Sequence, residues 1–518
     1  MTPGTGARSR CGTPRSRVAV ARAFLLGTLG VLASVRLVSA QCPDGTPPPC
    51  GRPAAVRAPA ANSVAVLSFR NVTQDTAYAY LAEGLSSEIA TSLSGVARLE
   101  VRSPGVVRSV QRSADADPRA LGRRLNVRYV VEGEYQRGGD RVRIAVRLVT
   151  VESGTQRWSA AWTRPTTDLL AVQEDIAREV ATSIAGQLLP AERAALASGT
   201  SNPAAYDRFL RGNFALRQRN LAEAIGEYGA AVALDSTLAR AWARVAYAYG
   251  LLLDRSGTFG GLPAESLLAR GMRAADRALA TDGGSSDAWM ARAMLAEAQD
   301  PLTLAGAREA FARAVAFDDR SEEAWHQYGA LLAYLGQDSA AFAAWQRTLE
   351  LDPGRPQTLA EVVRLYAFKG RFAEVTRRCG DSASPRVDAL QCIEALLVAG
   401  DTAGALARAD VLDRVSGYVY RTVPARVRAR QLDRSSPWVR QALQQPVRSC
   451  SQVANDRGPL WLALGESDSA LTAMEACAPR GPKVWFFLRN PAWDGVRDTP
   501  RFQRLWNETR PPGAEASR

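Results

Sequence analysis

Apolar and polar positions in residues 322–353 follow the period of an α-helix twice in succession. The first half carries four residues on one helix face, at i, i+3, i+4 and i+7: Trp325, Tyr328, Gly329 and Leu332. The second half repeats this arrangement with Ala341, Trp345 and Leu349. The stretch is therefore predicted to form two short amphipathic helices. Two such helices cannot bury their apolar faces alone, so the pattern also predicts stacked neighbours.

The ends of these two helices carry residues that favour helix termini. Gly336 tolerates the positive φ with which a helix commonly closes, and we expect it to end the first helix. Asp338 is the expected N-cap of the second helix. Pro353 is expected to stop that helix. A tight turn at 335–338 follows from these signals.

Neighbouring units repeat the pattern. Three large apolar residues open successive units: Trp289, Trp325 and Leu359. In the second helices, Ala307-x3-Phe311 recurs 34 residues later as Ala341-x3-Trp345. This spacing resembles the tetratricopeptide repeat, and the resemblance extends more loosely over residues 203–480. It implies an all-α solenoid of helix pairs, with residues 481–512 as a C-terminal capping segment.

Residues 63–190 show short apolar or alternating runs instead. Runs typical of strands lie at 64–69, 99–102, 127–135, 141–149 and 155–162, and helical patterns lie at 80–93, 117–125 and 169–188. Asp117 is the expected cap of the middle helix, with Pro118 in its first turn. The order β-α-β-α-β-β-β-α predicts an α/β sandwich built on one mixed sheet. The whole chain is thus expected to be a multi-domain protein, α+β followed by all-α.

Several segments of this region also resemble a known family. VAVLSFRN at 64–71, YLAEGLSSEIATSLS at 80–94 and LGRRLNVRYVVEGEYQRGGDRVRIAVRLV at 121–149 look like the amino-terminal domain of TolB and the related flagellar FlgO-type domain. Ser68 departs from the family, which usually has Pro there. The resemblance implies a role in envelope assembly or trafficking. In that family the domain often precedes tetratricopeptide repeats, sometimes behind a kinase, cyclase or winged-helix module.

Charge and composition narrow the expected chemistry. The chain of 518 residues has a net charge of +13, but no run of basic residues is interleaved with aromatic ones, so nucleic acid is not an expected partner. His326 is the single histidine, which excludes a metal site built from several histidines. We expect no metal, no cofactor and no enzymatic activity.

The N-terminus is expected to direct export. Residues 1–22 are rich in Arg, residues 23–35 are apolar and residues 38–40 are small. This pattern predicts a signal peptide over 1–40, a tether rich in Pro, Gly and Ala over 41–62, and a periplasmic protein. The alternative is an uncleaved segment, residues 23–38, that anchors the protein in the inner membrane.

Export changes the expectation for the cysteines. Six remain beyond residue 40, and an even number in an oxidising compartment permits disulfides. Cys42 and Cys50 bracket a turn-prone loop and form the candidate disulfide. Proximity in the sequence also suggests the pairs Cys379–Cys392 and Cys450–Cys477, with buried free thiols as the alternative.

The expected binding surface is the groove formed by the first helices of the repeats. The residues opposite to the core face of each first helix form the candidate protein-binding groove: Tyr247, Met290, Met294, His326, Tyr334, Arg364 and Phe368. Aromatic and Arg side chains give contact area and hydrogen bonds at low entropic cost, and Met adapts to varied ligands. The alternative is that several of these residues pack on adjacent repeats.

Two acidic residues offer a competing hypothesis. Glu132 and Glu134 lie on one face of a predicted strand, an arrangement that could serve acid–base catalysis, but nearby arginines favour cross-strand ion pairs. Three functions are therefore compared. The chain is a scaffold that binds protein or peptide partners in the cell envelope, a sensor that binds a small ligand between its two domains, or a hydrolase that uses His326 or these glutamates. We favour the scaffold.

Overall fold

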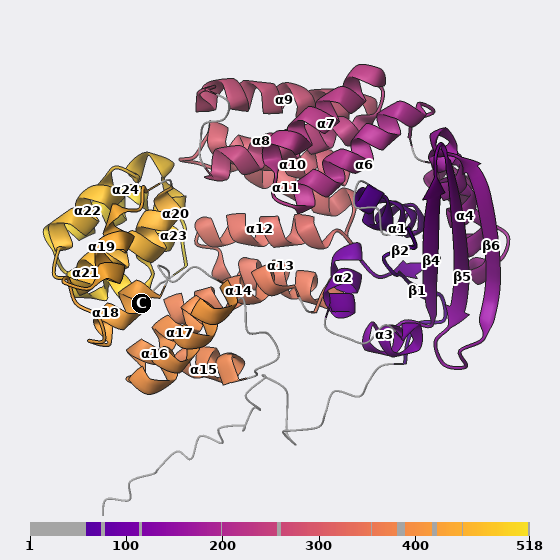
Figure 1. Cartoon of the computed structure of the whole chain (residues 1–518). Helices are drawn as coiled ribbons and strands as arrows, with labels where there is room; N and C mark the ends of the chain where they lie inside the picture. Colours follow the sequence, from indigo (N-terminus) through magenta and orange to yellow (C-terminus); the bar gives the residue numbers. More distant parts are fainter. Residues whose placement is uncertain are drawn as a thin grey trace, which may run out of the picture. The chain divides into compact units, whose positions relative to one another are not determined.

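The computed structural model describes residues 58–73, 78–112, 117–197, 199–255, 261–353, 355–380, 389–416, 422–447 and 449–515. The predicted signal peptide, most of the tether and the candidate pair Cys42–Cys50 lie outside these residues. An N-terminal sheet with its helices is followed by helices alone (Figure 1). The predicted fold class is confirmed. No helix among the described residues has the length and apolar character needed to cross a membrane.

The sheet is mixed, as predicted. Its strands are β1 (Ser63–Val66), β2 (Arg70–Asn71), β3 (Glu100–Val101), β4 (Tyr129–Gly138), β5 (Arg141–Thr150) and β6 (Gln156–Pro165). The order is β3-β1-β4-β5-β6, with β2 also paired to β4. The pairs formed by β1, β2 and β3 are parallel, whereas β4, β5 and β6 are antiparallel. The two-residue strand β2 is an addition to the predicted order.

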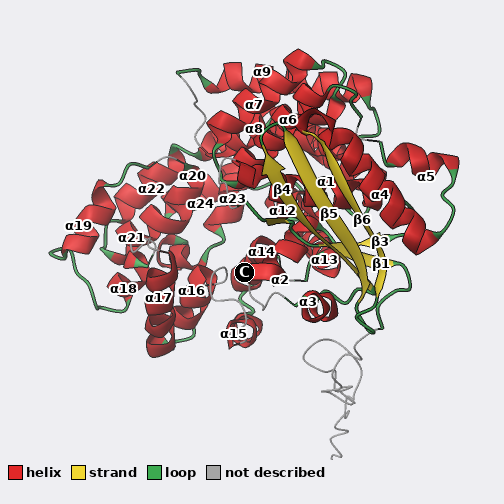
Figure 2. Ribbon diagram, turned by 45° about the vertical axis from the view of Figure 1, so that its right-hand side comes forward, coloured by secondary structure: helices red, strands yellow, loops and turns green. Residues whose placement is uncertain are grey.

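Helices pack on both faces of this sheet (Figure 2). On one face, α1 (Ala79–Ser94) and α4 (Leu169–Ala185) share a core with Val131 and Ile144. On the other face, α2 (Pro104–Arg112) and α3 (Pro118–Arg124) pack near Val130. Asp117 caps α3 as predicted, because its carboxylate accepts from two backbone N–H groups of the first turn. The helix α2 is a second addition.

Helix pairs make up most of the remaining chain. After η2 (Thr166–Asp168) and α5 (Pro190–Ala195), the first-helix and second-helix pairs are α6 (Pro203–Arg217) with α7 (Leu221–Leu234), α8 (Ala239–Arg255) with α9 (Ala264–Thr281), α10 (Ser286–Gln299) with α11 (Ala305–Phe317), α12 (Glu322–Tyr334) with α13 (Asp338–Leu351), α14 (Pro356–Phe368) with α15 (Phe372–Gly380), and α16 (Ala389–Val398) with α17 (Thr402–Ser416). These pairs confirm the predicted helical repeats.

The C-terminal part is built from shorter elements. They are α18 (Val423–Arg428), α19 (Pro437–Gln444), α20 (Cys450–Gln452), the π-helical turn η4 (Val453–Arg457), α21 (Gly458–Ala463), α22 (Ser467–Glu475), η5 (Ala478–Arg480), α23 (Pro482–Leu488), η6 (Pro491–Val496) and α24 (Pro500–Thr509). Apolar side chains from η4 to α24 share one core with α12, α13 and α14, whereas those of α18 and α19 form a separate cluster with Leu460. The chain therefore returns from its C-terminus to repeats that lie more than a hundred residues earlier.

In residues 322–353, which carry the clearest repeat pattern, the end of the first helix is as predicted but the N-cap of the second helix is not. Gly336 follows α12 with φ +69°, and the ring of Trp345 lies so close to Gly329 that a Cβ there would approach it to 2.5 Å. Asp338, however, is not an N-cap. The N-cap of α13 is Gln337, whose side chain makes no capping bond, and Asp338 is the first residue of the helix. Its carboxylate binds cationic side chains instead, as described below.

The sheet domain and the first repeats are joined by a continuous core. Apolar side chains of α1 and α4 pack into the same cluster as those of α6, α7 and α8. Ion pairs surround this contact: Arg240 with Glu88 at 2.7 Å, and Arg217 with Glu83 at 2.9 Å. The Tyr80 hydroxyl donates to Asp207 at 2.6 Å. The contact between the two domains is thus an extension of the core and not an open cleft.

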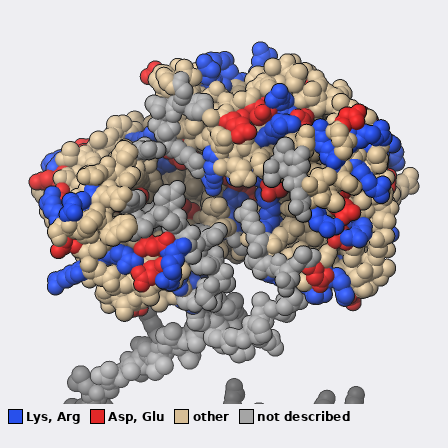
Figure 3. Space-filling model, in the orientation of Figure 1, with Lys and Arg blue, Asp and Glu red and all other residues tan. Residues whose placement is uncertain are grey.

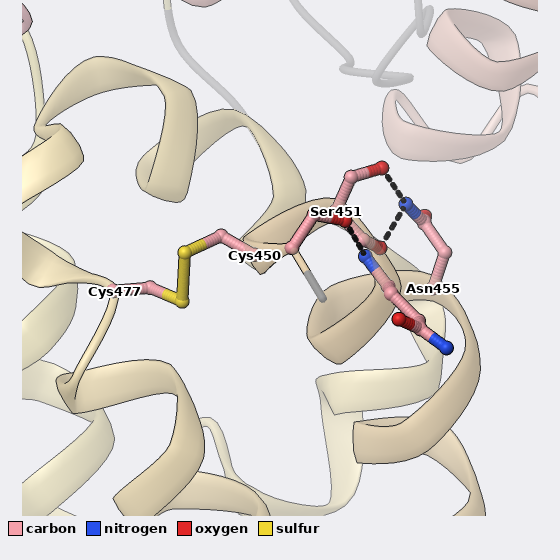
Figure 4. The surroundings of a disulfide bond; sticks show 6 residues. Cys450, Ser451, Asn455 and Cys477 are labelled. Atoms are coloured by element: carbon pink, nitrogen blue, oxygen red, sulfur yellow. Dashed lines mark hydrogen bonds between the residues drawn. A yellow bond between two sulfur atoms is a disulfide. The ribbon is translucent and has the colours of Figure 1, made fainter. Parts of the chain in front are cut away.

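Two disulfides lie in the helical region. Cys379 at the end of α15 is bonded to Cys392 in α16, and Cys450 in α20 is bonded to Cys477 just after α22. Both pairs are those suggested by proximity in the sequence. Figure 4 shows the second disulfide beside the turn where the Asn455 amide donates to the Ser451 carbonyl at 2.9 Å. Each bond ties together helices that are neighbours in the stack.

Candidate binding groove of the repeat domain

The first helices α8, α10, α12 and α14, together with the residue before α14, present a row of polar side chains. We call this set the polar row; its members are Arg244, Tyr247, Asp287, Glu323, Gln327, Arg355, Glu361 and Arg364. All of them are half-buried. Oppositely charged and neutral polar residues alternate within the set. Each one has a hydrogen-bond or ion-pair partner inside it, so the side chains are held in place before any ligand arrives.

Glu323 is the centre of the polar row. Its carboxylate accepts from the Tyr247 hydroxyl at 3.3 Å and from the Gln327 amide at 2.8 Å, and it forms an ion pair with Arg355. Burial alone would raise the pKa of this carboxyl. Burial is the largest single effect, but the electrostatic interactions with Arg355 and His326 and the hydrogen bonds from Gln327 and Arg355 together outweigh it and hold the pKa at about 2, so Glu323 is ionised at neutral pH. Three first helices are linked through this one side chain or its partners.

Two further pairs extend the polar row on either side. Arg244 of α8 reaches Asp287 of α10 at 3.0 Å, and the charge of Asp287 raises the pKa of that arginine. Within α14, Arg364 contacts both oxygens of Glu361 at 2.8 Å. The polar row therefore offers guanidinium and carboxylate groups side by side. Such a mixed surface suits a ligand that brings both hydrogen-bond donors and acceptors, as a polypeptide does.

His326 lies beneath the polar row and not in it. Its Nδ1 forms a hydrogen bond with the Thr358 hydroxyl at 2.9 Å, and the side chain is buried between α12 and α14. Burial lowers the pKa of this imidazole to about 4, so it is neutral at pH 7. Its backbone carbonyl accepts from the Trp345 indole at 3.1 Å. These contacts are those of a core histidine that joins two repeats.

The two methionines of the predicted groove fill space between first helices. Met290 is fully buried in the cluster formed with α11 and α12. Met294 is half-buried, and its Cβ would be only 3.2 Å from a Cβ placed on Gly250 of α8. The absent side chain at Gly250 lets α8 and α10 approach closely at this point. Both methionines therefore contribute packing between repeats.

The two aromatic residues at the far end of the predicted groove are covered by the chain itself. The Phe486 ring of α23 lies 5.2 Å from the Tyr334 ring and 5.1 Å from the Phe368 ring, between centroids. Phe487 adds a contact to Tyr334 at 6.4 Å. These separations are typical of aromatic pairs in cores. The positions chosen as peptide anchors thus hold an internal segment.

Charged contacts fix α23 on both sides of this aromatic cluster. Lys483 donates to Asp254 at 2.9 Å and to Glu297 at 3.2 Å, from α8 and α10. Arg489, directly after α23, binds Asp338 through two hydrogen bonds of 2.9 and 2.6 Å. Both partners of the second pair are only 1% exposed. Asp338 also accepts from Lys369 at 3.0 Å, so two cations share one buried carboxylate.

The residues after α24 complete the covering. Glu515 donates its backbone N–H to the Gly336 carbonyl at 2.8 Å, and its carboxylate accepts from the Ser339 backbone at 2.9 Å. A Cβ on Gly336 would meet Ala514 at 2.5 Å. The turn between α12 and α13 is therefore in direct contact with the C-terminal residues.

The seven predicted groove residues fall into three groups. Tyr247 and Arg364 belong to the polar row; Met290, Met294 and His326 pack between repeats; Tyr334 and Phe368 lie under α23. The other six members of the polar row were not predicted from the sequence: Arg244, Asp287, Glu323, Gln327, Arg355 and Glu361. Glu323 and Gln327 are four residues apart on the first helix that carries the clearest pattern, so they share a face, and this spacing could have revealed them.

Glu132 and Glu134 are engaged in ion pairs, as favoured from the sequence. Glu132 pairs with Arg147 on the neighbouring strand at 3.1 Å, and Glu134 pairs with Arg70 of β2. The arginines are not those closest in sequence. On the face in Figure 3, basic and acidic side chains are interspersed over the described residues. Among the described residues, no group of three or more His, Cys, Asp and Glu side chains is placed to hold a metal ion.

The sensor hypothesis places a small ligand between the two domains, and the described residues form a shallow depression at the domain link. Its lining comes from α4, the link and the turn between α7 and α8. The polar groups in it bind one another. The Asp235 carboxylate forms hydrogen bonds with the Thr200 and Thr237 hydroxyls, and the Asn202 amide donates to the Leu234 carbonyl at 3.0 Å. These bonds favour a structural role for the depression in holding the link.

Comparison with known proteins gives partial matches. No family model matches the chain. A curated protein described as putative adenylate cyclase 3, from Rhizobium meliloti (strain 1021), is 32% identical over 166 residues. That match covers 31% of this chain and 28% of the relative, so the chain spans little more than a quarter of the relative's length.

Solved structures with similar stretches include helical repeat proteins. PilF of Pseudomonas aeruginosa is 15% identical, with a TM-score of 0.32, over 41% of this chain and 92% of that one. YrrB, described as a TPR protein with an unusual peptide-binding site, is 16% identical, with a TM-score of 0.22, over 43% of this chain and 91% of that one. At such TM-scores the repeat assignment rests on the helix pairs and their 34-residue spacing. The resemblance to TolB and FlgO stays a prediction.

Proposed function

We propose that the chain is an exported, non-enzymatic scaffold of the bacterial envelope that binds a protein or peptide segment along the first helices of its repeats. The observation that carries this proposal is the polar row. Partly exposed charged and hydrogen-bonding groups lie on four successive first helices, and Glu323, Arg355 and their neighbours fix them in advance. Fixed groups lose little conformational entropy on binding, which favours recognition of a ligand.

The proposed binding region is narrower than the groove expected from the sequence. Tyr334 and Phe368 are covered by α23, so the partner segment would contact the polar row from Arg244 to Arg364. Because Arg and carboxylate groups alternate there, a segment with both charges, or with exposed peptide groups, would fit it. An apolar helix would remove water from these charged groups without offering them hydrogen bonds in return, and it is not the expected ligand.

The test is photocrosslinking in cells with full-length chains that carry a photoreactive residue at a single position. Position 327 lies in the polar row, and position 347 on the second helix α13 serves as the matched control. We expect a specific partner to be crosslinked from position 327 and not from position 347. Equal crosslinking from both positions, or none from 327, would contradict binding at the polar row.

Export is supported by the two disulfides, since such bonds persist in oxidising compartments and are rare in the cytoplasm. Cell fractionation followed by thiol labelling tests this part. We expect both pairs to resist labelling until a reductant is added, in the periplasmic fraction. Reduced thiols at all four positions in a cytoplasmic fraction would contradict export.

The relative described as an adenylate cyclase provides a test of the non-enzymatic part of the proposal. We expect the purified chain to form no cyclic AMP from ATP with magnesium or manganese. Formation of cyclic AMP that persists through further purification and is lost when a residue of this chain is substituted would contradict the proposal.

A further inference from the structure

The strand β6 ends the sheet without a neighbour on its outer side. In the sheet order it is the last strand, and no backbone hydrogen bond joins it to any described segment other than β5 and its own ends. Figure 1 shows β6 at the outer edge of the sheet. Its row of N–H and C=O groups on that side is available for pairing with another strand.

This edge lacks the usual protection against pairing. Natural edge strands carry inward charges, Lys, Pro or a bulge in the middle of the strand. Here the run Trp158–Trp162 contains two Trp, one Ser and two Ala and no charge. Protective features stand only at its ends, as a bulge at Arg157 and as Pro165. A central stretch of five residues is therefore open.

The side chains of this run are self-complementary. In an antiparallel pair centred on Ala160, Trp158 would face Trp162 of a second copy and Ser159 would face Ala161. Trp158 and Trp162 lie on the same side of the sheet, half-buried, with ring centroids 6.1 Å apart. Pairing would bring four indole rings into one row and cover their exposed parts. Aromatic cross-strand pairs of this kind stabilise antiparallel sheets.

The neighbouring registers are disfavoured by the alternation of side chains. If the pairing shifted by one residue, side chains of opposite faces would lie next to each other, and in one of the two directions Arg157 would also face Arg164, whereas the register centred on Ala160 keeps each face continuous and places no like charges opposite each other. A two-fold axis through Ala160 also closes the assembly, because each β6 edge is then used once. The register centred on Ala160 is the one that also places Trp158 opposite Trp162 of the second copy.

We propose that two copies of this chain associate through β6, antiparallel and centred on Ala160, to form one continuous sheet across the dimer. Ser159 and Ala161 are exposed on the outer face, so substitutions there leave the core untouched. The contact involves a short strand pair, so we expect a weak dimer that forms at high protein concentration.

The test uses sedimentation of the full-length chain and two charge variants. We expect Ser159→Lys/Ala161→Lys to weaken dimer formation about tenfold or more, because the introduced lysines face one another, and Ser159→Glu/Ala161→Glu to do the same. An equal mixture of the two variants should restore the dimer. A dimer that survives the lysines would overturn the proposal.

If the dimer is too weak to be detected by sedimentation, crosslinking provides the test. The Ala160→Cys chain should form an intermolecular disulfide under mild oxidation, since the two positions face each other on the axis. The Thr163→Cys chain, whose positions are apart in this register, should form at least tenfold less at equal time. A wild-type monomer combined with no crosslink at position 160 would overturn the proposal, as would capture of an extended peptide by β6 in place of a second copy.

Discussion

The two ends of the same helix face contrast in what covers them. At the polar row, side chains of α8, α10, α12 and α14 are partly exposed and bind one another. A few residues further along the same first helices, Tyr334 and Phe368 are covered by α23, with Lys483 and Arg489 paired to carboxylates. Different positions along one face of the first helices thus serve internal packing at one end and remain partly exposed at the other. A repeat pattern therefore predicts a face of the first helices, but not whether the chain itself covers that face or leaves it exposed.

The covered end depends most on its buried ion pair. Asp338→Ala would leave Arg489 as a buried cation without its bidentate partner, and we expect a loss of about 3–5 kcal/mol in the free energy of unfolding. Urea denaturation measures it. The control is Asp468→Ala, because Asp468 is 98% exposed in its pair with Arg501 and should contribute less than about 1 kcal/mol. Equal losses in the free energy of unfolding for Asp338→Ala and Asp468→Ala would show that the buried ion pair stabilises the covered end no more than an exposed pair does.

Substitution of Phe486 is expected to cause the next largest loss in the free energy of unfolding. Phe486→Ala would empty the space between Tyr334 and Phe368, at a cost of about 3–4 kcal/mol. Hydrogen exchange in α12 and α14 should then rise at their C-terminal ends, near the exposed rings. Phe317→Ala is the matched control, since that ring is 54% exposed. Unchanged exchange in α12 and α14 would mean that α23 is not what covers them.

The histidine between the two ends gives a pH-dependent effect of intermediate size. The pKa of His326 is about 4 in the folded protein and ordinarily near 6.5, so the unfolded chain binds the proton first as the pH falls. The folded state therefore loses stability as the pH falls from about 6.5 to about 4. A tenfold difference in proton affinity is worth about 1.4 kcal/mol, so the loss approaches about 2–3 kcal/mol.

The measurement is the difference between wild type and His326→Asn across this pH range, in which the contributions of other titrating groups cancel. Asn can keep a hydrogen bond to Thr358 but does not titrate. We expect wild type to lose more stability than the variant on acidification. Parallel curves for the two proteins would show that His326 is not buried in its neutral form.

Local pattern was sufficient to predict the elements of the fold. The strands and helices of the sheet domain follow alternation, capping and turn residues, as at Asp117, and the helix pairs follow the 3.6-residue period. The helix α2 is not predicted, because its nine residues include Gly and three Val, which have low helix propensity, although its apolar residues do follow the helical period. The sequence predicts Asp338 as an N-cap because Asp favours that position, whereas the structure pairs it with the distant Arg489.

The candidate site was less predictable, for a physical reason. Phe368 and Tyr334 do lie on the face expected of them. Their cover, Phe486, comes from more than a hundred residues downstream, and no pattern within a repeat contains that information. Likewise, Arg355 completes the polar row from the residue before a first helix, outside the period on which the prediction relied. Contacts between distant segments decide which part of a regular face stays open.

The smallest expected change in stability falls at the open end. Arg364→Ala would break a half-buried pair with Glu361 within one helix, so the free energy of unfolding should change by less than about 1 kcal/mol. Partner capture should nevertheless weaken by about tenfold or more, because Arg is a frequent binding hot spot. Arg347→Ala on α13 breaks a more exposed pair with Glu350, and it should change neither the free energy of unfolding nor partner capture appreciably. If Arg364→Ala instead destabilised the fold as much as Asp338→Ala does while capture by the folded fraction stayed intact, the polar row would be a packing element like the covered end, and the binding surface would have to lie elsewhere on the chain.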